Sequence, residues 1–134
     1  MVRLVCQRMP YLTLLFVLVA GCSKGKPVGD VQGKVTVNGQ PLAEGAVRFI
    51  PVNGDTSATG GLIRDGAFRV EVPVAKQRVE ISSNMVDQEK TPPNATADQI
   101  VMKSLVPARY NSQSNVTLDV VSGVNEVEYK LTNP

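Results

Sequence analysis

The feature that most constrains this chain is a series of short alternating runs separated by turn dipeptides. From Val31 to Val37, valines and one glycine occupy every second position, and Gln32, Lys34 and Thr36 stand between them. A period of two is typical of a β-strand with one buried face. Asn38-Gly39 follows directly, and both positions of this dipeptide accept positive φ, which favours a two-residue hairpin turn.

The same pattern recurs along the rest of the chain. Asp65-Gly66 predicts a second hairpin turn, and Ser122-Gly123 separates the last two runs. Including the run at 31–37, the alternation predicts strands at 46–52, 61–64, 67–72, 78–82, 114–120 and 125–131. Seven short strands at this spacing indicate an all-β fold, a seven-stranded antiparallel Greek-key sandwich.

One long interval in this pattern is polar. Residues 84–95 contain Pro92-Pro93 and few apolar side chains, so we expect a loop there. The stretch from Thr96 to Leu105 is compatible with a short helix, with Thr96 as N-cap and Gln99 as its capping-box partner, but the sequence does not decide this.

The first 21 residues have a different character. Arg3 and Arg8 give a positive start, residues 11–20 are almost continuously apolar, and small residues lead into Cys22. This order is typical of a secretion signal. A membrane span needs about 20 apolar residues, twice this run. Pro10 and the absence of a polar face argue against a buried amphipathic helix.

Val19-Ala20-Gly21-Cys22 resembles the lipobox of bacterial lipoproteins. The resemblance implies that the Cys22 thiol receives a diacylglyceryl group, that a peptidase cuts before Cys22, and that the new amine is acylated. A plain signal peptide with an incidental cysteine is the alternative. The other cysteine, Cys6, would be discarded with the signal, so the mature chain cannot form an internal disulfide. We therefore expect a signal peptide at 1–21, a lipidated tether at 22–29 and a sandwich domain at 30–134.

Composition excludes several partners. The chain has 14 basic and 12 acidic residues, and Arg3 and Arg8 belong to the predicted signal, so the mature chain is balanced. A balanced domain has no field that attracts nucleic acid, and we predict no nucleic-acid partner. Aromatic residues make up 4% of the chain and none is Trp. The chain therefore has few aromatic rings on which bases or sugars could stack.

The chain lacks histidine, which excludes His-based acid–base catalysis, the Ser-His-Asp triad and the usual zinc sites. Two carboxylate pairs, Asp87 with Glu89 and Glu126 with Glu128, are interpreted as solvated surface. The loop at 53–57 has too few ligands for a calcium loop. We therefore predict no catalytic residues, no metal and no cofactor, and hence no enzymatic activity.

Several segments together carry a family resemblance. Residues 32–42 read Gln-Gly-Lys-Val-Thr-Val-Asn-Gly-Gln-Pro-Leu and 45–51 read Gly-Ala-Val-Arg-Phe-Ile-Pro, followed by Asp65-Gly66-Ala67-Phe68 and, at 106–111, Val-Pro-Ala-Arg-Tyr-Asn. This order resembles carboxypeptidase regulatory-like domains, which implies a transthyretin-like (prealbumin-like) sandwich and no active site. Residues 73–78 depart from the family, because the glycine and tyrosine of its Pro-Gly-x-Tyr motif are missing.

The sequence thus predicts a lipoprotein of the cell envelope that contacts a membrane through lipid on Cys22. Some lipoproteins are retained at the inner membrane by an aspartate directly after the lipidated cysteine. This chain has Ser23 at that position, so we expect the protein at the outer membrane. The domain would be structural or bind an envelope protein or polysaccharide. A small-ligand binder and a hydrolase remain as alternatives. A contiguous apolar patch would favour a macromolecular partner, and a deep pocket would favour a ligand.

Overall fold

The computed structural model describes residues 25–54 and 56–133, so Cys22 and the predicted signal lie outside the described residues. Nearly all of its regular structure is β. The main strands are β1 (Val28–Val37), β3 (Glu44–Pro51), β4 (Thr59–Arg64), β5 (Ala67–Pro73), β6 (Lys76–Ser82), β9 (Thr117–Asp119) and β10 (Gly123–Leu131). Shorter elements are β2 (Gln40–Pro41), β7 (Asn84–Val86), β8 (Met102–Ser104) and the single 3-10 turns η1 (Ala97–Gln99) and η2 (Ala108–Tyr110). Within these ranges no helix is long and apolar enough to cross a membrane.

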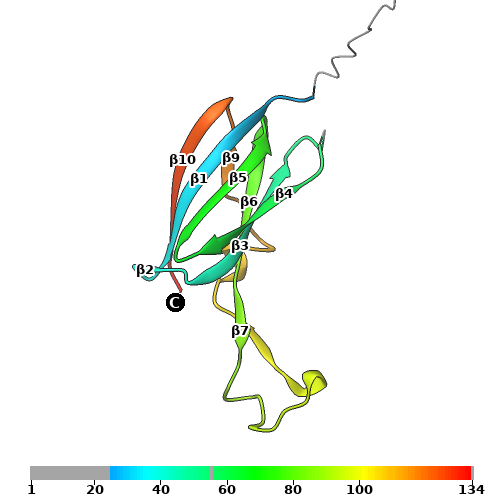
Figure 1. Cartoon of the computed structure of the whole chain (residues 1–134), viewed down its shortest axis with the longest axis vertical. Coiled ribbons are helices and arrows are strands. Elements are labelled where there is room, and N and C mark those ends of the chain that lie inside the picture. Colours follow the sequence, from blue (N-terminus) through cyan, green and yellow to red (C-terminus); the bar gives the residue numbers. More distant parts are fainter. Residues whose placement is uncertain (1–24, 55, 134) are drawn as a thin grey trace, which may run out of the picture.

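Seven strands form one continuous path in the order β10-β1-β5-β4-β3-β6-β9. β4 and β5 pair only beside their shared turn, at Arg64 and Ala67, and then diverge (Figure 1). The path therefore curls into two layers, with β10, β1 and β5 in one and β4, β3, β6 and β9 in the other. The predicted all-β sandwich is confirmed.

The pairing of β1 with β10 is parallel, from Gly29 opposite Gly123 to Val37 opposite Leu131. The other strand pairs are antiparallel, so the prediction of a wholly antiparallel sandwich was incomplete at this edge. The reason is that alternating burial looks the same for either strand direction.

Both predicted hairpin turns are present. Asn38 and Gly39 have φ of 51° and 81°, and Asp65 and Gly66 have φ of 50° and 75°. Positive φ at two successive central residues is the conformation that joins twisted antiparallel strands most tightly.

The core lies between the two layers and consists mainly of aliphatic side chains. Its buried members are Val31, Val35, Leu42, Val47, Phe49, Ile63, Phe68, Val72, Val79, Ile81, Val106, Val120 and Leu131. Two polar side chains, Gln77 and Ser114, are also fully buried, and the Ser114 hydroxyl donates to the Val79 carbonyl. The Gln77 Nε2 donates to the Pro73 carbonyl at 2.9 Å, whereas its Oε1 has no hydrogen-bond partner among the described residues. Buried amides are usually hydrogen-bonded, and Gln77 meets this condition through its NH2 group alone.

Residues 84–104 differ from the sequence prediction. They were expected to be a loop and, from Thr96, were compatible with a short helix, but β7 and β8 form a two-stranded antiparallel ribbon there. Only η1 is helical, and the Thr96 N–H donates to the Gln99 Oε1 at 3.2 Å, as one half of a capping box. The residues beyond η1 extend and pair with β7, so the helix does not continue.

Candidate binding surfaces

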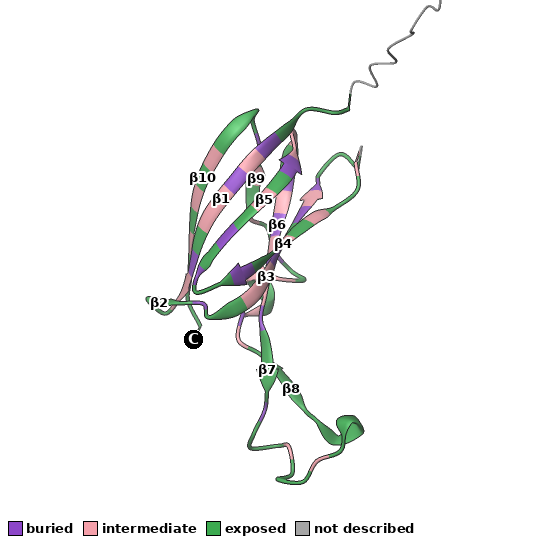
Figure 2. Cartoon of the chain, in the orientation of Figure 1, coloured by how far each residue is buried: buried purple, intermediate pink, exposed green. Residues whose placement is uncertain are grey.

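The ribbon projects from one end of the sandwich, and we call residues 84–104 the arm. In Figure 1 it extends beyond the sheets, and Figure 2 shows that it is exposed along nearly all of its length. Its root is fixed to the sandwich, because the Leu105 N–H donates to the Ser83 carbonyl at 2.8 Å and the Ser83 hydroxyl donates to the Glu44 carbonyl at 2.5 Å. The arm is therefore part of the ordered fold.

Hydrogen bonds within the arm organise its tip. The Asp87 carboxylate is buried, accepts the Glu89 N–H at 3.2 Å and lies 3.9 Å from the Lys90 ammonium. The Thr91 hydroxyl accepts the Val101 N–H at 3.0 Å, and the Asp87 N–H donates to the Val101 carbonyl at 2.7 Å. The tip is thus tied back onto the strand that follows it.

Apolar side chains are exposed on this organised element. Half of the large hydrophobic residues that are most exposed among the described residues belong to the arm, namely Met85, Val86, Ile100, Val101 and Met102. Exposed apolar side chains that gather in one place mark interaction surfaces more often than isolated ones do.

A groove of about 810 Å³ lies at the root of the arm. Met85 and Leu105 line it together with Leu62 of β4. Leu62 is 65% exposed, so the groove carries the apolar surface from the arm onto the outer face of β4. Glu44 and Arg64 also line it, so its rim is charged.

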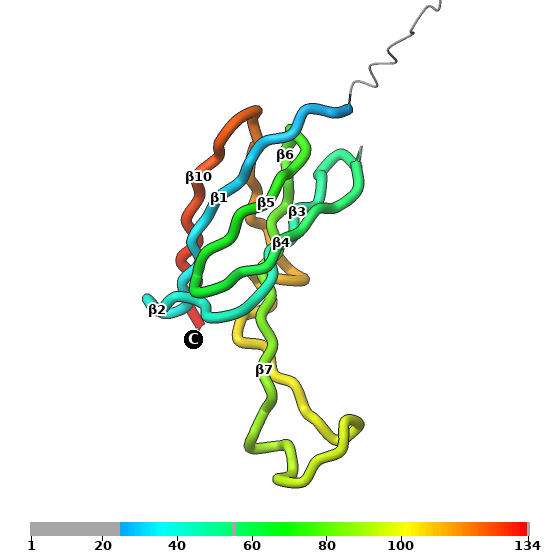
Figure 3. Tube along the Cα trace, viewed as in Figure 1, coloured from blue at the N-terminus to red at the C-terminus, as the bar shows by residue number. Residues whose placement is uncertain are grey.

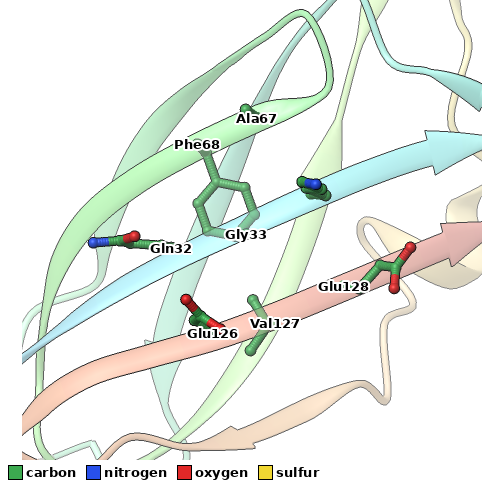
Figure 4. A pocket seen from close by; sticks show the side chains of 8 residues that line it. Gln32, Gly33, Ala67, Phe68, Glu126, Val127 and Glu128 are labelled. Carbon is green, nitrogen blue, oxygen red and sulfur yellow. The ribbon is translucent and has the colours of Figure 1, made fainter.

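Two further hollows lie on the sandwich. One of about 390 Å³ lies over β3 and β4 and is lined by small residues such as Ala46 and Gly60 together with Leu62. The other, of about 580 Å³, lies over β1, β5 and β10 and is lined partly by Gln32, Lys34, Glu126 and Glu128 (Figure 4). All three are surface hollows that open to solvent.

An ion pair stands beside the hollow over β1. Arg69 contacts the Asp30 carboxylate through two nitrogens, at 3.1 and 2.6 Å, and Gln32 donates to the same carboxylate at 3.1 Å. The hydrogen bond from Arg69, with help from Gln32, holds the pKa of Asp30 below its usual range. Because Arg69 is largely exposed, this pair contributes little to stability.

The two carboxylate pairs that the sequence analysis singled out lie in different places. Glu126 and Glu128 are both exposed on β10, and Glu128 lies 3.8 Å from the Lys130 ammonium. Asp87 is buried at the tip of the arm, where it orders the turn, while Glu89 is exposed. Within the described ranges no cluster of three or more His, Cys, Asp or Glu is arranged to hold a metal ion. Cys22, the predicted lipidation site, lies outside these ranges, as does Asp55 of the 53–57 loop.

The arm is the surface that sequence reasoning missed. Each of its strands has only three residues, and Pro92-Pro93 and the polar tip are typical of an ordinary loop. The available signal was the apolar run Ile100-Val101-Met102, which follows directly on the polar stretch.

Comparison with known proteins adds no functional information. No family model matches the chain, and no curated protein matches it in sequence. Among solved structures, it is similar to a DUF3823 family protein from Parabacteroides merdae, with 16% identity and a TM-score of 0.40. It is also similar to a leucine-rich repeat protein from Bacteroides thetaiotaomicron, with 17% identity and a TM-score of 0.41. Each match covers 81% of this chain, which spans 46% of the first protein and 12% of the second.

Proposed function

We propose that the chain is a lipoprotein of the bacterial cell envelope whose sandwich is a non-catalytic domain that binds another protein. The membrane part of the proposal rests on the apolar run at 11–20 and the sequence Val19-Ala20-Gly21-Cys22. Two or three acyl chains on Cys22 would give stable attachment, where one chain gives marginal binding.

The arm is the observation that carries the binding part of the proposal. An organised projection with exposed apolar side chains favours a macromolecular partner, whereas the hollows are open and lack the enclosure typical of small-molecule sites. A protein partner is favoured over a polysaccharide, because sugar sites usually offer an aromatic ring and the large apolar residues exposed on the arm are Met, Val and Ile.

The proposal includes the carboxypeptidase regulatory-like family for residues 30–131. The confirmed all-β sandwich and the positive φ of Gly39 and Gly66 within the quoted motifs support it. In this family the sandwich would serve as a scaffold, with function carried by the surface features that project from it.

The lipid anchor is tested by expressing the full chain and Cys22→Ala in a bacterium with labelled fatty acid. The full chain should take up label and float with membranes. Cys22→Ala should take up none and remain uncleaved or soluble. A matched Cys6→Ala variant should behave like the unaltered chain, because Cys6 lies in the discarded segment. Label on Cys22→Ala would refute the anchor, and fractionation of the labelled membranes would test the expected outer-membrane location.

A further inference from the structure

We infer that the partner of the arm is a second copy of this chain, and that two arms pack face to face through Val86, Ile100 and Met102. This inference rests on the proposed function for its geometry, because both copies would be anchored in one membrane. The proposed function requires a protein partner for the arm, and the inference says which protein that is.

The register of the arm separates its side chains into two faces. Val86 pairs with Met102, and the hydrogen bond from Asp87 to Val101 continues the same register beyond β7. Side chains alternate along a strand, so Val86, Ile100 and Met102 share one face. Met85 and Lys103 pair on the opposite face, and the same register puts Asp87 and Val101 there. The first face is uncharged, so two copies of it can meet without bringing like charges together.

The ribbon itself favours a covering layer. A two-stranded ribbon is marginally stable in water, and three or more strands or a packed face are needed for stability. The described residues provide no second layer over the face formed by Val86, Ile100 and Met102, all of which are exposed. Two ribbons stacked about 10 Å apart would bury this face in both copies.

The position of the arm favours a second copy over lipid. The first described residue, Gly25, follows Cys22 by a few residues, and the chain enters β1 at the end of the sandwich opposite the arm (Figure 3). Copies anchored in one membrane would therefore hold their arms at the same height and pointing the same way, related by a twofold axis along the arm. The tip of the arm carries Glu89, Lys90 and Asp98, and these charges oppose insertion into a membrane.

The size of the surface indicates how strong this contact is. The three apolar side chains of this face are each 39–54% exposed, and together they offer less than the roughly 800 Å² per partner that a stable interface buries. The contact should therefore be weak between free molecules. Anchoring two copies in one membrane raises their effective concentration, and this is the condition under which a weak contact forms.

Single-cysteine cross-linking of the full chain tests the inference. Met102→Cys places a thiol on the proposed contact face, and Lys103→Cys places one on the opposite face of the same strand as a matched control. Both are made with Cys6→Ser, once with Cys22 retained in membranes and once with Cys22→Ser in solution at rising concentration. A short bis-maleimide is the probe, and dimers are separated on a denaturing gel.

We expect Met102→Cys to form dimers about tenfold faster than Lys103→Cys in membranes, and to form them in solution only at high concentration. Faster dimer formation at Met102 in solution alone would support the arm contact even if lipid labelling showed no anchor. Equal rates at the two positions, or no dimers in either background, would overturn the inference. Cross-linking of Met102→Cys to a different protein at the expense of the dimer would also overturn it.

Discussion

The aromatic ring of Phe68 lies across Gly33 of the neighbouring strand, in the space that a side chain at position 33 would occupy (Figure 4). A β-carbon at Gly33 would overlap the ring and would stand 2.8 Å from Cγ2 of Val127. The same ring lies 6.2 Å from the Phe49 ring and 6.5 Å from the Tyr129 ring, between centroids. Gly33 therefore lets one aromatic side chain reach across a strand and link the two layers.

Gly33→Ala should destabilise the sandwich by about 1–3 kcal/mol, because the added methyl group displaces a packed ring. Urea denaturation followed by circular dichroism measures the free energy of unfolding. The same substitution in a Phe68→Leu background should cost less, since the shorter side chain leaves room for the methyl group. Equal costs in the two backgrounds would show that Phe68 is not the reason for glycine at this position.

Phe68→Ala should cost about 3–5 kcal/mol, because it removes a buried ring and leaves a cavity between the layers. Phe68 is 6% exposed, whereas Leu62 on the outer face of β4 is 65% exposed. Leu62→Ala is therefore the matched control and should change stability by less than about 0.5 kcal/mol. Similar losses for the two variants in thermal or urea unfolding would contradict the assignment of Phe68 to the core.

The sequence predicted the sandwich because its strands alternate and its turns use dipeptides with one strong conformational preference. It missed features that depend on contacts distant in sequence. Gly33 continues the inward series of Val31 and Val35, but only the fold shows that Phe68 fills its place. Gln77 is polar, and the hydrogen bond from its Nε2 to the Pro73 carbonyl, which accompanies its burial, is visible only in the fold. The arm was missed because its exposed strands carry no one-sided alternation that a buried face would impose.

Gly39→Val tests the first hairpin turn. Gly39 has a φ of 81° and no atom within 4 Å of an added β-carbon, so a substitution there reports backbone conformation alone. Valine should cost about 1–2 kcal/mol, because a β-branched residue resists left-handed backbone. Gly39→Asn should cost less, since asparagine accepts positive φ and already does so at position 38. Equal unfolding midpoints for the two variants would contradict the turn assignment.

Tyr129 should make the folded state sensitive to alkaline pH. Burial raises the pKa of Tyr129 to about 12, whereas an unfolded tyrosine ionises near pH 10. Between these values the unfolded chain releases a proton that the folded chain retains, so the unfolded state gains stability. The contribution of Tyr129 to the free energy of unfolding is therefore complete below about pH 10, and it declines as the pH rises towards 12. In Tyr129→Phe this part of the decline should be absent, as measured by the free energy of unfolding across that range.

Tyr110 provides the matched control, because its environment lowers the pKa of the phenol, whereas the environment of Tyr129 raises it. The hydrogen bond with Thr132 lowers the pKa of Tyr110, so the folded chain releases its proton before the unfolded chain does. Tyr110→Phe therefore removes a gain in stability at rising pH and should leave the alkaline decline in place or make it steeper. A spectroscopic titration of the phenols should place the highest pKa at Tyr129. If Tyr129→Phe lost stability with pH as steeply as the unaltered chain, burial of the Tyr129 hydroxyl would not be the cause.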